Sequence, residues 1–406
     1  MEAYQTLLCS LISLFSTRLR FSRFLNTRSI TMDPSKLAIA FKPMDEDAEL
    51  QSSPTPWFVV TKALSEVYYK GLPSEPLLIA TTNPSPFEDP TGLEAYSVLK
   101  ELRELGNHPL ASVWDHGLAD RLRRSLNMTC VNWTSIEALR IVKDGESSGP
   151  VIVWIGVEFG ALTFEEGSNV AFNCHAFINR YGFRDYHVEI KESLTFGIPI
   201  STKDRPWAEG TGSFYLSAGG DDKGNNRECE RRNNSRAHED MTYTLDLAVI
   251  KIDAGKLDAN NYCGNTINIG DKYTCQEFME KVSKTVLMNP CEPCLVIFKN
   301  GANTLTTISK ANNVSSYMCT HFAGKYWELR EWLIIPTDKN SGPFSRKGDS
   351  GSCITDIFCR IVGILTGSSG ATDSSDVTYV TPISFIMKVL HTTKFFKYAH
   401  LKPVLI

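Results

Sequence analysis

The sequence has little of what marks a membrane, nucleic-acid-binding or disulfide-stabilised protein. No apolar run approaches the roughly 18 residues that a membrane-spanning helix needs. The 42 basic and 46 acidic side chains leave a formal charge of −4, which gives no reason to expect a nucleic-acid partner. The 11 cysteines are odd in number and irregularly spaced. They therefore predict a reducing compartment such as the cytoplasm, and not a disulfide framework.

One long stretch lacks large apolar residues altogether. Between Ala218 and Asp240 there is no Val, Ile, Leu, Met, Phe, Tyr or Trp. A buried strand cannot form from such a sequence, because it offers nothing to pack against a core. We therefore expect residues 219–240 to be an exposed loop without strand pairing.

A metal or cofactor signature is also missing. Cys291 and Cys294 form a C-x-x-C pair, but no second pair and no histidine at ligand spacing lies nearby. Structural zinc sites need four such ligands, so the sequence predicts neither a metal nor a cofactor.

The first 32 residues differ from the rest in composition. Four arginines follow the short apolar run Leu7 to Phe15, and Glu2 is the only acidic residue. A secretory signal would place its basic charge before the apolar run. An arginine-rich start fits a mitochondrial transit peptide better, and the alternative is an upstream extension of the reading frame with Met32 as the working start. We treat residues 1–56 as an N-terminal extension and lead-in.

Residues 57–200 have the pattern of a separate α+β domain. We expect a helix over Leu93 to Leu105, a strand over Pro150 to Val157, a helix over Phe164 to Arg180 and a strand over Tyr186 to Ile190. The pattern predicts a scaffold without evident chemistry. Its four histidines are treated as ordinary surface or boundary residues: His108, His116, His175 and His187.

The chemistry of the chain is concentrated in Gly348-Asp349-Ser350-Gly351-Ser352. Glycines permit backbone conformations that side chains forbid, so this segment can present one hydroxyl on a tight turn. Ser350 is the candidate nucleophile, and the N–H groups of Gly348 and Ser350 are the candidate oxyanion hole. The apolar run Ile361 to Leu365 follows as a buried strand that would form a pocket wall.

This segment resembles the chymotrypsin-like (trypsin-like) serine peptidases of the PA clan. Asp246-Leu247-Ala248-Val249-Ile250 is similar to the strand start that carries the triad aspartate of that family. The order Asp246 then Ser350 agrees with the family order of His, Asp and Ser. The resemblance implies a hydrolase that transfers acyl groups from a peptide or protein substrate.

The fold that this resemblance implies is a mainly-β double β-barrel after the α+β domain. The Gly-x-Gly strand at residues 209–216 would open a first barrel, of which residues 205–260 hold only a remnant. Residues 261–400 would form a second barrel with a C-terminal helix over Phe385 to Leu390. The expected strands of the second barrel cover residues 294–298, 304–309, 314–319, 328–335 and 378–382.

Residues 33–400 are also similar to a set of uncharacterised proteins from mushroom-forming fungi with a trypsin-like C-terminal half. Gly149 to Gly156, Gly210 to Gly212, Asp246 to Ile250 and Gly348 to Gly367 carry the likeness. It implies fold and ancestry, and no biological role.

The histidine that should act as the base has no evident place. The strand that carries it in the family would fall in the polar stretch between Ala218 and Asp240. His238 is the candidate that remains there, and a loosely placed base can cost about 10²-fold in rate. Three interpretations stay open: a serine endopeptidase-like protein of poor activity, a non-catalytic binding or structural module, and an incomplete gene model.

The candidate substrate pocket consists of Phe344, Leu365, Thr366 and Gly367. Phe344 lies six residues before Ser350, where the resemblance places the base of the pocket. An uncharged phenylalanine there does not support a preference for Lys or Arg. A small or apolar substrate side chain and a filled pocket remain as options.

Overall fold

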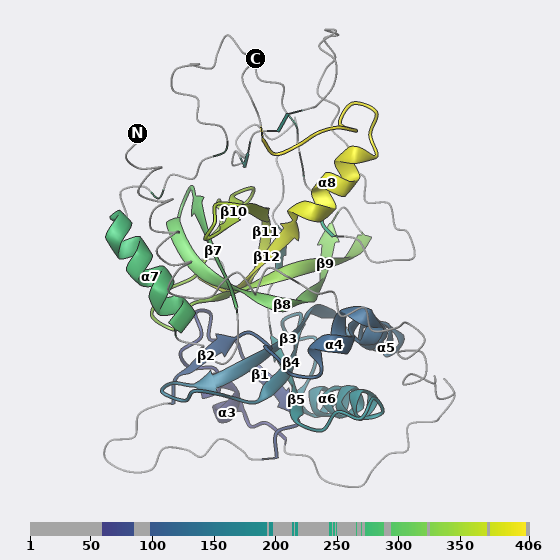
Figure 1. The fold of residues 1–406 in the computed structure, drawn as a ribbon. Helices are drawn as coiled ribbons and strands as arrows, with labels where there is room; N and C mark the ends of the chain where they lie inside the picture. Colours follow the sequence, from purple (N-terminus) through teal and green to yellow (C-terminus); the bar gives the residue numbers. More distant parts are fainter. Residues whose placement is uncertain are drawn as a thin grey trace. The chain divides into compact units, whose positions relative to one another are not determined.

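The computed structural model describes residues 59–84, 98–192, 195–197, 213–214, 216–217, 243–245, 247, 249, 265, 269, 273–287, 294–322, 325–371 and 374–402. This part of the chain is mixed but mainly β, and its 12 strands pair into one sheet (Figure 1). None of its helices is both long and apolar enough to cross a membrane. The expected loop over 219–240, with His238, and the aspartate Asp246 lie outside the described residues.

The N-terminal end of the sheet contains a parallel strand pair. Strands β4 (Val151–Val157) and β5 (Tyr186–Glu192) are parallel, and helix α6 (Phe164–Asn179) connects them. The apolar run of β4 is buried at every position, as expected for a strand covered on both faces. Antiparallel neighbours extend the sheet: β1 (Leu78–Thr81) beside β5, β3 (Trp133–Lys143) beside β4, and β2 (Lys100–Arg103) beside β3.

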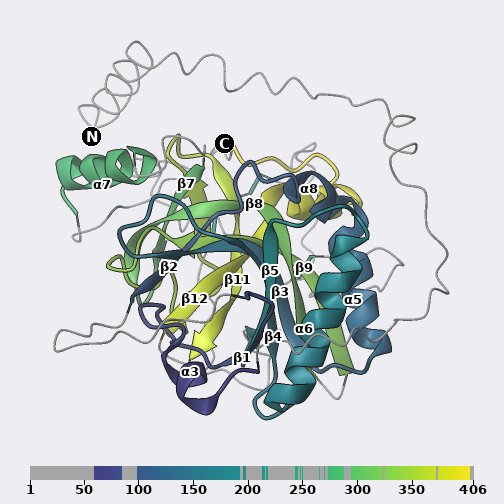
Figure 2. The same ribbon diagram turned by 90° about the horizontal axis from the view of Figure 1, so that it is seen from below.

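Helix α6 covers one face of these strands. It begins with a capping box, in which the Thr163 hydroxyl accepts from Glu166 N–H at 3.2 Å and the Glu166 carboxylate accepts from Thr163 N–H at 2.8 Å. Figure 2 shows α6 beside helix α5 (Ala119–Met128) along the sheet. Both helices pack on the alternate residues of β4 that face them: Val151, Val153, Ile155 and Val157.

The C-terminal half of the sheet closes on itself as a ring of six antiparallel strands. Each strand pairs with two other strands of the ring in the order β7-β8-β9-β12-β11-β10, and β10 returns to β7. The strands are β7 (Leu295–Gly301), β8 (Leu305–Phe322), β9 (Lys325–Pro336), β10 (Cys353–Asp356), β11 (Ile361–Ala371) and β12 (Ser374–Pro382).

The interior of the ring contains an apolar cluster to which every strand contributes at least one buried side chain. Phe344, from the loop between β9 and β10, joins this cluster and is only 2% exposed. The strand members are Ile297, Ala311, Ile334, Ile354, Leu365 and Val380.

The two halves of the sheet are joined through β3 and β8. Ser135 pairs with Met318, and Ile136 pairs with Tyr317. The remaining face of β4 also packs toward the ring, because Trp154 shares a buried cluster with Leu333 and Tyr379 of β9 and β12. These contacts make the described strands one continuous sheet. The division of the chain into four segments, residues 1–56, 57–200, 205–260 and 261–400, stays a prediction.

The other helices and strands are short or lie at the edges. Helix α8 (Ile383–His391) directly follows β12, and helix α7 (Cys275–Leu287) precedes β7 (Figure 1). The N-terminal region adds helix α3 (Lys62–Val67), helix α4 (Ala111–Val113) and the π-helical turn η2 (Trp114–Leu118), and β6 (Thr195–Gly197) pairs with β11.

Two expectations need correction. The helix expected over Leu93 to Leu105 is wrong in the part described, because Lys100–Arg103 forms β2 and pairs with β3. Apolar residues every third position do not distinguish a helix from a short strand that gains its hydrogen bonds from a neighbour. The separate strands expected at 304–309 and 314–319 are one long strand, β8, whose pairing with β9 shifts register between Ala311 and Ser315.

Candidate active site

The segment around Ser350 folds into two consecutive β-turns that share Asp349. Asp349 N–H donates to the carbonyl of Arg346 at 3.0 Å, and Ser352 N–H donates to the carbonyl of Asp349 at 3.0 Å. The third residue of each turn is a glycine with positive φ, +94° at Gly348 and +80° at Gly351. This is the type II pattern, which other residues adopt only with strain.

Ser350 lies between these two glycines and is half-buried. Within the described part of the chain, neither its hydroxyl nor its peptide N–H is hydrogen-bonded. The turn is attached to β11, because Gly351 N–H donates to the Leu365 carbonyl at 2.9 Å and Leu365 N–H donates to the Ser352 carbonyl at 3.0 Å. The backbone around Ser350 is therefore fixed, while its own polar groups are not used by the described residues.

Asp349 is fully buried beneath the turn and accepts hydrogen bonds on both carboxylate oxygens. Oδ1 accepts from the N–H groups of Asn303 (2.8 Å) and Thr304 (3.2 Å). Oδ2 accepts from Arg346 N–H at 3.0 Å, from the Thr304 hydroxyl at 2.6 Å and from Lys299 Nζ at 3.1 Å. A carboxylate with this many partners is a structural anchor and has no lone pair directed at a substrate.

The charge state of Asp349 follows from these contacts. Burial by itself would raise the pKa of this carboxyl. The ammonium of Lys299 and the hydrogen bonds from Thr304, Arg346 and Asn303 outweigh burial and hold the pKa below its ordinary value. Asp349 is therefore ionised at neutral pH.

No described histidine is positioned as a base. His391 Nε2 contacts the carbonyl of Ala399 at 2.8 Å, and His400 Nδ1 accepts from Lys402 N–H at 3.3 Å. Neither they nor any other histidine side chain in the described part of the chain is hydrogen-bonded to Ser350. The roles of His238 and Asp246 stay predictions, because both residues lie outside the described part.

The residues on either side of Asp246 contact the ring. Thr244 N–H donates to the Glu331 carboxylate of β9 at 2.9 Å, and the Thr244 carbonyl accepts from the Thr381 hydroxyl of β12 at 2.8 Å. Leu247 and Val249 pack in the cluster around Ile364 and helix α8. Ile364 is the neighbour in sequence of Leu365, which holds the Ser350 turn.

The four residues of the expected pocket occupy the wall and the interior of the ring. Phe344 and Leu365 are buried in its core. The Thr366 hydroxyl donates to the carbonyl of Tyr379 at 3.2 Å, and Gly367 pairs with Tyr379 on one side and Gly197 on the other. Their role in binding substrate, like the oxyanion role of Gly348 and Ser350, stays a prediction.

Sequence reasoning missed two charged residues of this region, Lys299 and Glu331. Lys299 lies two positions after Ile297, so alternation along β7 places both side chains on the inner face of the ring. That signal was readable from the sequence. Glu331 offers no such signal, because it is buried by the segment around Thr244, which is far away in the chain.

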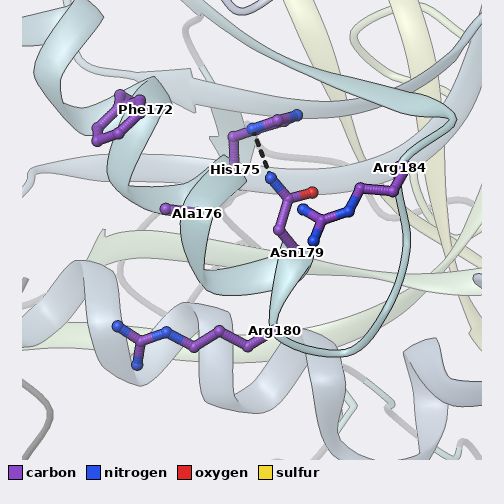
Figure 3. Close-up of a pocket in the computed structure, with 6 residues that line it drawn as sticks. All are labelled: Phe172, His175, Ala176, Asn179, Arg180 and Arg184. Atoms are coloured by element: carbon purple, nitrogen blue, oxygen red, sulfur yellow. Dashed lines mark hydrogen bonds between the residues drawn. The ribbon is translucent and has the colours of Figure 1, made fainter. Parts of the chain in front are cut away.

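An open surface pocket of about 390 Å³ lies on helix α6 and the loop that follows, and both apolar and polar side chains line it (Figure 3). His175 Nδ1 lies 3.0 Å from the Asn179 amide nitrogen, and Arg184 points toward the same amide. Burial, followed by the charges of His187 and Arg184, lowers the pKa of His175. No residue of the Ser350 turn lines this pocket, and no metal-binding group of three or more His, Cys, Asp or Glu occurs among the described residues.

Comparisons with known proteins add little to this geometry. No family model matches the chain, and no curated protein matches it. Among solved structures, the chain is similar to a glutamic-acid-specific serine protease that uses a histidine triad in substrate binding. The match has 18% identity and a TM-score of 0.17, and it covers 23% of this chain and 44% of that one. This is a weak structural similarity to part of a serine protease, and it carries no argument about what this chain does.

Proposed function

We propose that the protein is a serine endopeptidase-like protein in which Ser350 is an acyl-accepting nucleophile and turnover is poor. The observation that carries this proposal is the Ser350 turn itself. A half-buried hydroxyl without a hydrogen-bond partner in the described part of the chain sits between two glycines of positive φ. A buried, ionised Asp349 anchors the turn from below.

The fold around the turn supports a chymotrypsin-like second barrel. Six antiparallel strands close into a ring, and a helix, α8, follows the last of them. Thr244 and Leu247, which lie on either side of the candidate aspartate in the sequence, contact the same ring at Glu331 and near Ile364. This arrangement is compatible with Asp246 orienting a base for Ser350.

We expect poor turnover because no histidine of the described residues is hydrogen-bonded to Ser350. Serine is a weak nucleophile until a neighbouring group removes its proton. Binding and an oxyanion hole alone retain about 10³–10⁴-fold acceleration over water, a small part of what a complete triad supplies. His238 is the residue from which we expect any remaining base catalysis.

Labelling by an alkyl fluorophosphonate tests the proposal. We expect one slowly formed adduct, which peptide mass spectrometry places on Ser350. Ser350→Ala should abolish the adduct. Ser341→Ala is the matched control, because Ser341 is another half-buried loop serine and its hydroxyl is bonded to the carbonyl of Asp338. Equal labelling of several serines, or labelling that survives Ser350→Ala, would contradict the proposal.

A second candidate function is a non-catalytic binding or structural module. It is favoured by the burial of Phe344 and Leu365 in the ring core, which supports a filled pocket. This candidate predicts no adduct at Ser350 under conditions in which a serine peptidase control is fully labelled. The same experiment therefore separates the two functions.

A further inference from the structure

The ion pair between Lys299 and Asp349 is completely buried directly beneath the Ser350 turn. Both side chains have 0% exposure, and Lys299 Nζ lies 3.1 Å from Asp349 Oδ2. Lys299 Nζ also donates to the Thr304 hydroxyl at 2.5 Å, and that hydroxyl donates to Asp349 Oδ2 at 2.6 Å. The three side chains form a closed set of contacts in which each polar group has a partner.

The hairpin between β7 and β8 fits tightly against this ion pair. A Cβ added at Gly301 would lie 2.5 Å from Asp349 Oδ1 and 2.6 Å from Lys299 Nζ. One at Gly348 would collide with the side-chain amide of Asn303, which already donates to the carbonyl of Lys347. At both places the backbone of one segment lies against a side chain of the other, so neither the hairpin nor the turn has space to shift alone.

We propose that Lys299 is a positioning residue, whose ammonium holds Asp349 against the β7–β8 hairpin and so fixes both turns around Ser350. The proposal rests on the proposed acyl-accepting role of Ser350. Asp349 is the residue shared by the two turns, so its position sets the direction of the Ser350 hydroxyl and N–H. Among the described residues, Lys299 Nζ donates to Thr304 and Asp349 and forms no hydrogen bond with Ser350, so we expect its effect on Ser350 to pass through Asp349.

The consequence of losing the ammonium follows from the burial of its partner. A carboxylate left alone in a dry interior is strongly unfavourable, so Asp349 would take up a proton or move toward water. Either change alters the contacts that shape the turn. Removing both charges together avoids the unpaired charge. The single amide oxygen of Asp349→Asn can still accept from the N–H groups of Asn303 and Thr304, and its NH2 group can donate to the Thr304 hydroxyl, so only the Arg346 N–H loses its acceptor.

Four variants of the full chain test the proposal. They are Lys299→Met, Asp349→Asn, the double variant, and Lys310→Met as control. Lys310 is a matched control, because it is also a buried lysine of the ring, with a side chain that is 2% exposed. Its Nζ lies 3.5 Å from the carboxylate of Glu104, which is not part of the Ser350 turn. Two readouts are compared: the rate at which fluorophosphonate labels Ser350, and hydrogen exchange of the Gly351 and Ser352 amides.

In Lys299→Met we expect exchange at these two amides to rise and the labelling rate to fall, the labelling rate by about 10²-fold. The double variant should recover most of the labelling rate, since the charges act as a pair. Lys310→Met should leave both readouts at the wild-type level.

Equal effects in Lys299→Met and Lys310→Met, or no recovery in the double variant, would overturn the positioning role and indicate a purely structural one. Hydrogen exchange of the Gly351 and Ser352 amides tests the positioning role of Lys299 even if no serine is labelled in the wild-type chain. In that case a selective rise in Lys299→Met would support the positioning role of Lys299, while the proposed function of Ser350 would fail.

Discussion

Replacing Glu331 by glutamine should remove a pH dependence of stability that this one residue creates. The Glu331 side chain has 0% exposure on β9, and its carboxylate accepts from Thr244 N–H and from the Thr381 hydroxyl at 3.2 Å. No cation pairs with it among the described residues. Burial, only partly offset by hydrogen bonds from Thr244, Thr381 and Thr366, raises the pKa of Glu331 to about 7.

The magnitude follows from the difference between the folded and unfolded chain. The pKa rises from 4.5 to about 7, a difference of about 2.5 pH units, and each unit corresponds to about 1.4 kcal/mol. Between these pH values the folded state holds a proton that the unfolded state has released. The free energy of unfolding therefore falls as pH rises, by about 3 kcal/mol in total. The contribution is complete below pH 4.5 and is lost as pH passes through about 7.

Urea unfolding of the wild type and Glu331→Gln at several pH values between 5 and 8.5 measures this effect. Histidines and other groups titrate equally in both proteins, so they cancel in the difference between the two free energies. We expect the variant to gain stability relative to the wild type as pH rises, by about 1.4 kcal/mol per unit until pH 7 is passed. A difference that stays constant with pH would refute the reasoning.

Three further substitutions test the packing of the ring, the Ser350 turn and the start of helix α6. Phe344→Ala should lower the free energy of unfolding by about 3–5 kcal/mol, because it opens a cavity where all six ring strands meet; a loss under about 1 kcal/mol in urea unfolding would show that Phe344 is not packed there. Gly348→Ala should cost at least about 1–2 kcal/mol for its positive φ, since the new methyl group also meets Asn303, and an unchanged unfolding midpoint would argue against a type II turn. Thr163→Ala should cost about 1 kcal/mol through loss of the capping box of α6, whereas no change in thermal unfolding would mean that the box does not form.

The elements that the sequence predicted well are those with strong local signals. Val151–Val157 is an uninterrupted apolar run, and it forms the fully buried β4. The helix after Thr163 has both a capping box and an apolar face, and α6 spans Phe164–Asn179. The turn at Ser350 was also readable, because its glycines sit where the structure has positive φ.

The features that sequence reasoning missed depend on contacts between distant residues. Pairing of β3 with β8 joins residues about 180 positions apart, and no local pattern encodes such a partner. The Lys299–Asp349 ion pair likewise spans 50 positions. Alternation along β7 could have placed Lys299 inside the ring, but only the closed strand order brings it under the Ser350 turn.

The account depends most directly on whether Ser350 cleaves peptides, and how fast. The measurement is hydrolysis of a mixed peptide library by the wild-type protein, Ser350→Ala and His238→Ala, with products identified by mass spectrometry. We expect very slow cleavage by the wild type, none by Ser350→Ala, and a further loss in His238→Ala if that histidine supplies the residual base. Rapid cleavage that Ser350→Ala abolishes would contradict the proposal that turnover is poor. Cleavage that is equal in the wild type and Ser350→Ala would contradict the assignment of Ser350 itself.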